Sequence, residues 1–283
     1  MCPPNHFAVK YSINPWMNPS VWTASLSDRS VRQWQAFYET LLASGAEVDL
    51  LKASPALPDL VFTANAAVIL DRKALLARFR YAERRGEEHV FMGVLRRMKL
   101  EGDIEEICTL PASLVFEGAG DCIWDRSRNY FWSGYGPRSD RASRDVVADL
   151  FGVDCVALEL VDPRFYHLDT AFCVLPFGEI LYYPAAFTRA ARLAIEDRVH
   201  PFQLIPLGHE DASNFAANLV SFGRQIVLSK CSEKLRRRLE ERAYDVIETP
   251  LDAFQHSGGS ACCLTLRTDH TLLRTRNAFH SLC

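Results

Sequence analysis

The stretch HLDTAFCVLPFGEILYY, residues 167–183, decides the fold that we expect for this chain. It is typical of two short apolar strands joined by a turn at Phe177-Gly178-Glu179, with a polar residue before the first strand. Similar stretches recur on both sides of it, and the polar residues that precede them lie 45 to 52 residues apart. We call these five the heading residues: Asn65, Glu117, His167, Asn218 and Cys263.

Helix-like stretches follow the first four units, namely EEHVFMGVLRRM, RASRDVVADLFG, TRAARLAIEDRV and SEKLRRRLEERA. A strand-and-helix unit that recurs every ~50 residues is a signature of propellers and solenoids. Five units without evident capping repeats favour a closed ring. We therefore predict an α/β fold, a five-bladed pseudo-fivefold α/β-propeller built from strand-strand-helix repeats, in which the heading residues meet at the axis. The alternative is coincidence, because polar residues are common at strand starts.

The part of the chain before the repeats predicts two strands and a helix. FAVKYSI alternates apolar and polar residues as a half-buried strand does, and AEVDLL is a second expected strand. Between them, Ser27-Asp28 is a candidate helix cap and Gly45 a candidate helix end. The apolar face of this helix would carry Val31, Trp34, Phe37 and Leu41.

Composition is that of an ordinary soluble globular protein. The 283 residues are 48% hydrophobic and 24% charged, and the formal net charge of −3 gives no electrostatic reason to bind nucleic acid or an anionic membrane. No linker rich in Pro, Gly or Ser divides the chain, so we expect one catalytic domain, residues 1–283, with a C-terminal tail at 268–283. The oligomeric state stays open, and a homo-oligomer is possible.

Cysteine usage and the N-terminus indicate the cellular compartment. The nine cysteines are scattered without a CxxC motif, and MCPPNHFAVKYS lacks the basic flank and apolar core of a signal peptide. No apolar run approaches the ~20 residues that span a bilayer. We expect free thiols in a reducing cytoplasm, with no metal and no cofactor.

The last unit, SGGSACCLTLR at 257–267, places two thiols after a glycine turn and before an apolar run that suits a buried strand. A thiolate is a strong nucleophile when a neighbouring group activates it. If the units converge, His167 is available as general acid and base, and Glu117 can orient its ring. Asp169 would share a strand face with His167. This set suits attack on the electron-poor carbon of a planar cation. The plain alternatives are inert buried thiols, a packing histidine and turn carboxylates.

Four motifs, in the same order along residues 2–267, resemble those of the guanidino-group modifying superfamily. They are PDLVFTAN (58–65), FEGAGD (116–121), YHLDTAF (166–172) and SGGSACCLTL (257–266). The superfamily includes arginine deiminase, dimethylarginine dimethylaminohydrolase and the amidinotransferases, and its fold is a five-fold pseudosymmetric α/β-propeller. The opening PPNHFAVKYSINPWMNP resembles the arginine dihydrolase branch in particular.

The resemblance implies a role for each residue of the set. Cys263 would attack the guanidinium carbon and form a covalent thiouronium intermediate, and His167 would protonate the departing amine and then activate water. Glu117 and Asp169 match carboxylates that bind the guanidinium nitrogens. Cys263 fits the family pattern better than Cys262, because Leu-Thr-Leu follows it, although some relatives with paired cysteines use the first.

The resemblance also suggests residues that bind the substrate. Arg78 lies where relatives carry an arginine for the substrate carboxylate, with Arg80 as a near competitor, and Arg138 in YGPRSD matches a second such arginine. A solvated loop charge is the plain alternative for either. Asn65 stands where deiminases and dimethylarginine hydrolases have Asp, whereas the dihydrolase branch has Asn. A neutral amide holds the urea-like product less tightly, which would permit a second hydrolysis.

The function we predict is hydrolysis of the guanidino group of arginine by cysteine covalent catalysis, releasing ornithine, ammonia and carbon dioxide. The alternatives are a dimethylarginine hydrolase or arginine deiminase that gives citrulline, and an amidinotransferase, which would need a site for an acceptor amine. From a different class, a non-catalytic propeller could bind a small cationic ligand in the same cleft. Asp169 favours an unmethylated guanidinium, because dimethylarginine hydrolases more often have Lys after His-Leu.

Overall fold

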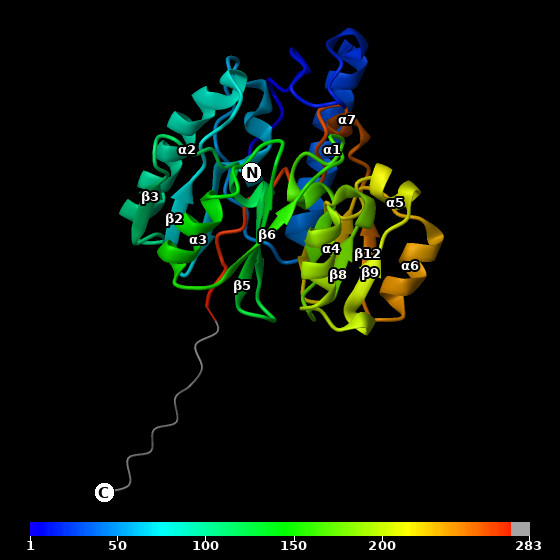
Figure 1. Cartoon of the computed structure of the whole chain (residues 1–283). Coiled ribbons are helices and arrows are strands. Elements are labelled where there is room, and N and C mark those ends of the chain that lie inside the picture. The colour runs from blue at the N-terminus through cyan, green and yellow to red at the C-terminus, as the bar shows by residue number, and fades with distance from the viewer. Residues whose placement is uncertain (273–283) are drawn as a thin grey trace, which may run out of the picture.

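The computed structural model describes residues 1–272, and the expected tail at 268–283 therefore lies mostly outside the described residues. These residues form four three-stranded sheets of one design (Figure 1). In each sheet the first two strands pair antiparallel and the last two pair parallel. The strands are β1 Ala67–Leu70, β2 Lys73–Leu76, β3 Glu106–Thr109, β4 Cys122–Asp125, β5 Tyr130–Tyr135, β6 Cys155–Glu159, β7 Phe172–Val174, β8 Ile180–Tyr182, β9 Leu204–Pro206, β10 Val220–Phe222, β11 Gln225–Leu228 and β12 Asp245–Glu248.

A helix connects the two parallel strands of every sheet, because parallel neighbours need a crossover connection. These crossover helices are α2 Ala82–Glu101, α3 Ser143–Phe151, α4 Arg189–Glu196 and α6 Glu233–Glu240, and they confirm the four helix-like stretches. The other helices are α1 Ala24–Ala43, α5 His209–Ser213 and α7 Asp252–Gln255. Short 3₁₀ turns are η1 Pro19–Val21, η2 Pro58–Val61, η3 Thr63–Ala66, η4 Gly118–Gly120, η5 Leu168–Thr170, η6 Pro184–Ala186 and η7 Pro201–Gln203.

The expected helix near the N-terminus is present but begins earlier than predicted. Thr23 caps α1 by accepting a hydrogen bond from the backbone N–H of Leu26, so that Ser27-Asp28 lies within the first turns. Trp34, Phe37 and Leu41 are buried as expected, whereas Val31 is exposed. Thr23 precedes Ser27 in the chain and its hydroxyl can cap a helix. Because no helix breaker lies between Thr23 and Ser27, the helix begins at the earlier of the two capping residues.

Three expected strands are wrong. FAVKYSI, AEVDLL and SGGSACCLTLR contain no strand in the described residues. In the last stretch, turn hydrogen bonds from Leu264 N to Ser260 O and from Thr265 N to Cys262 O replace a strand ladder. The unit at 60–70 is also only partly a strand, because Asn65 lies in η3 and the strand begins at Ala67. Local turns thus hold the first four heading residues before, and not within, the strands, and Cys263 lies in a turn that no strand follows in the described residues.

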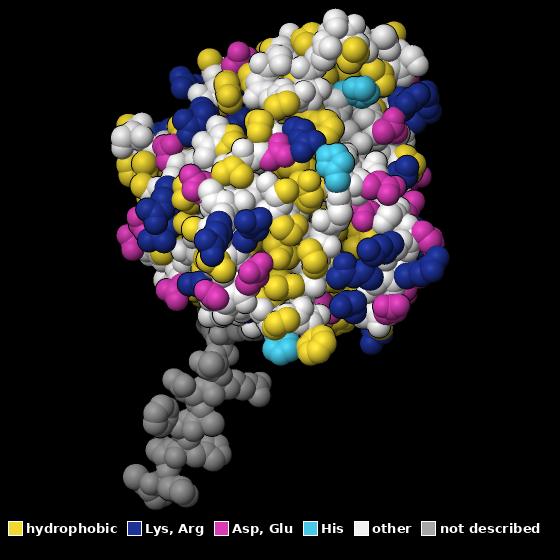
Figure 2. Space-filling view, turned by 45° about the vertical axis from the view of Figure 1, so that its right-hand side comes forward, with side chains coloured by type: hydrophobic (Ala, Val, Ile, Leu, Met, Phe, Trp, Pro, Cys, Tyr) yellow, Lys and Arg dark blue, Asp and Glu magenta, His cyan; other side chains and the backbone are white. Residues whose placement is uncertain are grey.

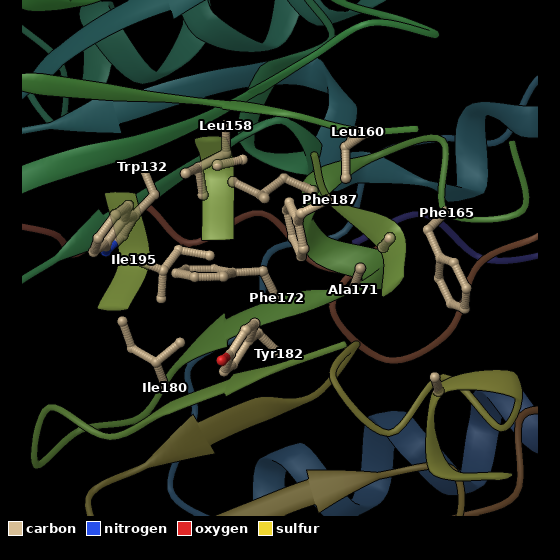
Figure 3. Close-up of a cluster of buried hydrophobic side chains, with 14 of the residues drawn as sticks. Trp132, Leu158, Leu160, Phe165, Ala171, Phe172, Ile180, Tyr182, Phe187 and Ile195 are labelled. Atoms are coloured by element: carbon tan, nitrogen blue, oxygen red, sulfur yellow. The ribbon is translucent and has the colours of Figure 1, made fainter. Parts of the chain in front are cut away.

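Apolar side chains fill the space between neighbouring sheets. One cluster joins Trp132 of β5, Phe172 of β7, Ile180 of β8 and Ile195 of α4 (Figure 3). The ring centroids of Trp132 and Phe172 lie 5.3 Å apart. This cluster packs the second sheet against the third and thereby fixes the two turns that precede their first strands.

The surface carries both signs of charge, and basic and acidic side chains are interspersed over the face in Figure 2. This agrees with the small formal net charge of −3. Within residues 1–272, no helix is both long enough and apolar enough to cross a membrane.

Replacing Phe172 by Ala should lower the free energy of unfolding by about 3–5 kcal/mol, because the ring is fully buried and a cavity would remain. Urea unfolding measures the change. Phe202→Ala is the control, since that ring is 82% exposed, and a change below about 0.5 kcal/mol is expected there. Equal losses for the two variants would contradict the packing described.

Candidate active site

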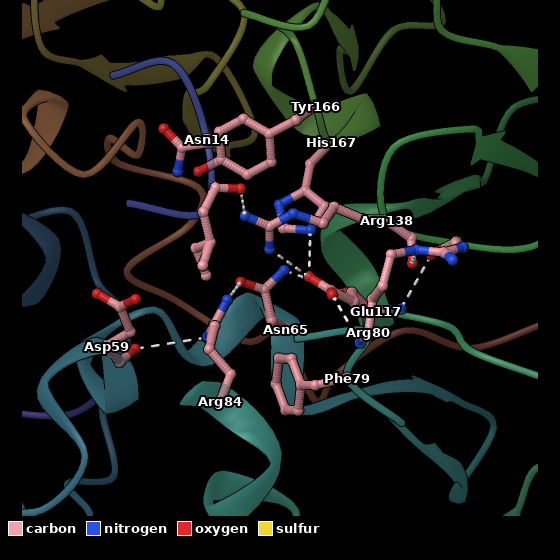
Figure 4. Close-up of polar contacts among 12 residues, drawn as sticks. Asn14, Asp59, Asn65, Phe79, Arg80, Arg84, Glu117, Arg138, Tyr166 and His167 are labelled. Atoms are coloured by element: carbon pink, nitrogen blue, oxygen red, sulfur yellow. Dashed lines mark hydrogen bonds and ion pairs between the residues drawn. The ribbon is translucent and has the colours of Figure 1, made fainter. Parts of the chain in front are cut away.

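The first three heading residues lie in contact at the centre of the molecule (Figure 4). Asn65 donates from Nδ2 to the backbone carbonyl of Glu117 at 3.1 Å. The Glu117 carboxylate lies 2.7 Å from Nε2 of His167, measured from Oε2. All three side chains are buried. The structure therefore brings together residues that are about 50 positions apart in sequence.

The last two heading residues, Asn218 and Cys263, connect the third unit to the first by further hydrogen bonds. Asn218 donates from Nδ2 to the carbonyl of Asp169 at 3.1 Å and to Sγ of Cys263 at 3.1 Å. Its Oδ1 accepts from the backbone N–H of Cys263. The carbonyl of Cys263 in turn accepts from the N–H of Ala64, the neighbour of Asn65. Hydrogen bonds thus link the five units in a circle, except between His167 and Asp169, where the backbone makes the connection.

Two glycines of the FEGAGD motif allow this close approach. Gly118 has φ +63°, and a Cβ there would press on the backbone of Asn65. A Cβ on Gly120 would overlap Nδ2 of Asn65 and touch the ring of His167. Any side chain at either position would push the first three units apart.

Glu117 and His167 form a buried pair whose charge state follows from their surroundings. Burial alone would raise the pKa of Glu117, but the Arg138 guanidinium and the His167 hydrogen bond hold that pKa well below its usual range. Burial lowers the pKa of His167 to about 4, against the opposite influence of Glu117. At neutral pH an ionised carboxylate therefore faces a neutral imidazole. Nε2 must donate to it, so Nδ1 is the basic nitrogen of the ring.

Asp169 and Cys263 form a second buried pair. The thiol donates to Oδ2 of Asp169 at 3.2 Å, and Oδ1 has no hydrogen-bond partner among the described residues. Burial raises the pKa of Asp169 to about 7, although hydrogen bonds from Cys263 and Asn218 lower it. Burial and then the Asp169 charge raise the pKa of the Cys263 thiol well above its ordinary value. Because no cation contacts it among the described residues, this thiol is protonated at neutral pH.

The two adjacent cysteines line different cavities. Cys263 lines a small polar space together with Asn65 and Arg138. Cys262 lines a separate apolar cavity of about 130 Å³, with Trp124 and Phe172 among its walls. Of the two thiols, Cys263 lines the pocket that contains Arg138, whereas Cys262 lines the apolar cavity, although its thiol also lies close enough to Asp169 to lower the pKa of that carboxylate.

Arg138 is buried against Glu117, as its position in the motif YGPRSD allows. Its Nη1 donates to Oε2 of Glu117 at 2.9 Å and its Nη2 to the carbonyl of Ile13 at 3.0 Å. The guanidinium lies between the rings of Tyr81 and Tyr166, at 4.8 and 4.5 Å from their centroids. Stacking and ion pairing offset the cost of burying this charge.

Arg78 does not join the cluster. Its side chain donates to the carbonyl of Pro111 on the outside, and only its backbone, paired with Phe116, lies near the site. Arg80 is closer, since its backbone N–H donates to Oε1 of Glu117, but its guanidinium pairs with Asp140. The structure therefore does not bring the side chain of Arg78 together with Glu117 and His167, because its guanidinium is bound at Pro111.

Two residues of the pocket were missed from the sequence. Arg84 of α2 is buried, donates from Nη1 to Oδ1 of Asn65 at 2.8 Å, and forms a two-pronged ion pair with Glu87. Asp59 is buried beside it and accepts from Tyr11, while its Oδ1 has no partner among the described residues. The available signals were an Arg and a Glu three positions apart on a helix and the acid within the PDLVFTAN motif.

Hydrogen bonds of Asp121 hold the backbone turns that carry Glu117 and His167. It accepts from the hydroxyl of Ser139 at 2.6 Å and from the N–H of Leu168 at 3.0 Å. Ser139 in turn accepts from the N–H of Glu117. This carboxylate therefore ties together the two turns that carry the pair.

Within residues 1–272, no group of three or more His, Cys, Asp or Glu side chains has the geometry to hold a metal ion. The thiol of Cys263 and the guanidinium groups of Arg84 and Arg138 line the pocket. The carboxylates of Asp169 and Glu117 contact these groups, and the neutral imidazole of His167 contacts Glu117.

Comparison with known proteins gives consistent matches over most of the chain. A family model described as N,N dimethylarginine dimethylhydrolase, eukaryotic, matches residues 4–268. The bifunctional arginine dihydrolase/ornithine cyclodeaminase AgrE of Nostoc sp. is 43% identical over 94% of this chain, which spans only 37% of that protein. The N(G),N(G)-dimethylarginine dimethylaminohydrolase of Mycobacterium tuberculosis is 36% identical over 94% of this chain and 84% of its own length.

A solved structure extends the likeness to three dimensions. The N-terminal domain of ArgZ, a cysteine-to-serine mutant bound to substrate and described as an arginine dihydrolase from cyanobacteria, has a TM-score of 0.91 at 41% identity. The match covers 96% of this chain and 98% of that domain. The two chains share one α/β fold.

The Cys263 thiol should react with iodoacetamide slowly at pH 7 and about tenfold faster for each pH unit up to pH 9, because the thiolate is the reactive form. Peptide mass spectrometry follows the label. Asp169→Asn should speed labelling at pH 8 by removing the charge that holds the proton, whereas the exposed Asp28→Asn should not. A rate that does not change with pH would show that the thiol is already ionised.

Proposed function

The chain belongs to the N,N dimethylarginine dimethylhydrolase family within the guanidino-group modifying superfamily, and on that premise we propose that it hydrolyses the guanidino group of arginine. The observation that carries the proposal is the convergence of Cys263, Asp169, Glu117 and His167 from three units of the chain. Cys263 and Arg138 line one buried pocket; Asp169 contacts the thiol, and Glu117 contacts both Arg138 and His167. Thiol, carboxylates and imidazole are the set that covalent guanidine hydrolysis requires.

The guanidinium group would bind between the carboxylates. Oδ1 of Asp169 is buried, lacks a donor among the described residues, and belongs to the carboxylate that contacts the Cys263 thiol. A buried carboxylate oxygen without a donor is unfavourable, and a guanidinium N–H relieves this. Glu117 would contact the opposite side of the same group, as the resemblance implies.

The amino-acid end of the substrate would meet charges of both signs. Arg138 and Arg84 line the pocket and would bind the carboxylate, so Arg84 takes the place expected for Arg78. Oδ1 of Asp59 lines the same pocket without a partner and would accept from the α-ammonium group. The space between these groups is only about 10 Å³, so entry of arginine requires that the segment with Ile13 move.

The first half-reaction follows from these charge states. The bound cation lowers the thiol pKa, the proton passes to the neutral ring of His167, and the Cys263 thiolate attacks the guanidinium carbon. The ring gives the proton to a terminal nitrogen, the C–N bond breaks, and ammonia leaves a thiouronium. His167 then accepts a proton from water, which attacks the same carbon, and the C–S bond breaks to restore the thiol and leave a ureido product.

A second hydrolysis would convert this product to ornithine. Thiolate attack on the ureido carbon expels a second ammonia, and water releases an N-carboxy product that decomposes to ornithine and carbon dioxide. In sum, arginine and two waters give ornithine, carbon dioxide and two ammonia molecules. Asn65, a neutral amide in place of a carboxylate, supports this outcome, as does the likeness to two bifunctional arginine dihydrolases. Hydrolysis of dimethylarginine to citrulline is the second candidate, favoured by the family model.

We also propose that the described units form a single domain arranged as a five-bladed ring. The support is the circle of hydrogen bonds through the heading residues, which closes from Cys263 to Ala64. The fifth blade would consist of the two ends of the described chain, which carry no strand.

Incubation with arginine should release ornithine and ammonia in a ratio of one to two, with little citrulline, and dimethylarginine should be a poorer substrate. Mass spectrometry with ammonia assay measures the products. Citrulline as the final product would replace dihydrolase by deiminase chemistry, and no turnover of any guanidine would leave only a binding protein.

Cys263→Ser should abolish turnover, because the hydroxyl is a far weaker nucleophile, while Cys262→Ser should retain at least about half of the wild-type rate because its side chain lines the other cavity. Steady-state kinetics with both purified variants decides the matter. A dead Cys262→Ser beside an active Cys263→Ser would reverse the assignment.

The value of kcat/KM for arginine should rise as pH increases from 5.5 through about 7. Asp169 has a pKa raised to about 7, so it is protonated and neutral at lower pH and cannot attract the guanidinium. The corresponding rise in kcat should occur at a lower pH than the rise in kcat/KM, because the bound cation stabilises the ionised carboxylate of Asp169. A kcat/KM that is level between pH 6 and 8 would contradict this assignment.

A further inference from the structure

We propose that Glu87, which has no contact with the reacting groups, positions the amide of Asn65 through Arg84 and so decides whether the reaction proceeds past the ureido product. This inference rests on the proposed dihydrolase function. It makes Glu87 a positioning residue, and it assigns the choice of product to a network of three side chains and not to Asn65 alone.

Glu87 holds Arg84 rigidly. It lies one turn further along α2 and is fully buried, and its two oxygens accept from Nε and Nη2 of Arg84 at 2.9 and 2.8 Å. The guanidinium also lies over the ring of Phe79, 4.5 Å from the centroid. A two-pronged ion pair fixes both the position and the plane of a guanidinium. Nη1 is thereby directed at Asn65.

The partners of Asn65 allow only one orientation of its amide. Arg84 can only donate, so the atom that it contacts at 2.8 Å must be the amide oxygen. The backbone carbonyl of Glu117 can only accept, so the atom 3.1 Å from it must be the amide nitrogen. Rotation by half a turn would put donor against donor and acceptor against acceptor.

This orientation points the nitrogen towards the reacting groups. Nδ2 lies so close to Gly120 that a Cβ there would overlap it, and the same Cβ would lie 3.5 Å from the ring of His167. Asn65 also lines the pocket that contains Cys263. The amide nitrogen has two N–H groups and the Glu117 carbonyl accepts one, so one donor is available on this side.

A donor at this point distinguishes the two substrates of the successive hydrolyses. A guanidinium has only N–H groups and needs acceptors, whereas a ureido group has a carbonyl oxygen that needs a donor. An amide N–H can bind that oxygen and stabilise the negative charge that it gains when Cys263 attacks the ureido carbon. An aspartate at position 65 would offer only acceptors, so the ureido product would be held poorly and leave as citrulline.

Glu87 is needed because Arg84 has another acceptor within reach. Nη2 of Arg84 already lies 3.4 Å from the backbone carbonyl of Asp59, whose buried Oδ1 has no partner among the described residues. With one of the two carboxylate acceptors removed and the charge gone, Arg84 would turn towards Asp59. The amide oxygen of Asn65 would then lose its donor, and the amide would be free to rotate.

The test compares Glu87→Gln with Glu83→Gln, a control on the same helix whose side chain is exposed. Ornithine and citrulline are quantified by mass spectrometry at saturating arginine, and circular dichroism confirms that each variant is folded. We expect the fraction of consumed arginine that is released as citrulline to rise at least about fivefold in Glu87→Gln, and not in the control. If Glu87→Gln does not fold, Glu87→Asp, which keeps the charge on a shorter side chain, should change the fraction in the same direction.

A slower Glu87→Gln enzyme with an unchanged ratio of citrulline to ornithine would overturn the inference, because Glu87 would then have a structural role only. Wild-type enzyme that releases citrulline alone would defeat the proposed function and this inference with it. The two failures are distinguishable, because the first appears only in the variant and the second already in the wild type.

Discussion

The ionised carboxylate of Glu117, buried at the centre of the molecule, is the constraint on which the rest of the structure depends. A buried charge is stable only when it is paired and hydrogen-bonded, and loss of one partner of such a pair costs about 3–5 kcal/mol. Glu117 has Arg138 and His167 as partners at 2.9 and 2.7 Å. Arg138 in turn holds the N-terminal segment at Ile13. One charge thus fixes which nitrogen of the His167 ring is basic, the position of Arg138, and the N-terminal segment that lines the pocket at Ile13.

The pair of Asp169 and Cys263 differs from the pair of Glu117 and His167, because its surroundings favour the uncharged forms. No cation contacts Asp169 or Cys263 among the described residues, and burial raises the pKa of both. The positive charge that would ionise them is the guanidinium of the substrate itself. In the proposed mechanism the thiol is therefore activated only when a guanidinium has bound, which would couple recognition to reactivity. The proposal for Asn65 and Arg84 extends the same logic to the product, since Arg84 fixes the amide so that its nitrogen is the donor on the side of Glu117.

The sequence predicted the repeat, the four crossover helices and the convergence of Asn65, Glu117, His167 and Cys263, because near-constant spacing reflects repeated local structure. It predicted a strand for the apolar run of SGGSACCLTLR, although side-chain and backbone partners from other units and local turn hydrogen bonds hold this stretch in turns. Arg84 was missed because its burial depends on tertiary contacts with Asn65, and helical spacing alone does not distinguish a buried ion pair from a surface one. Arg78 was preferred because the motif register says nothing about which way a side chain points.

The most direct test of the central claim is to stop the reaction with acid within one turnover and to fragment the peptide that contains both adjacent cysteines. Covalent catalysis predicts a transient adduct whose mass is that of arginine less ammonia, carried by Cys263, and its absence from the Cys263→Ser variant. An adduct on Cys262, or turnover without any adduct at times that span the first cycle, would contradict the mechanism.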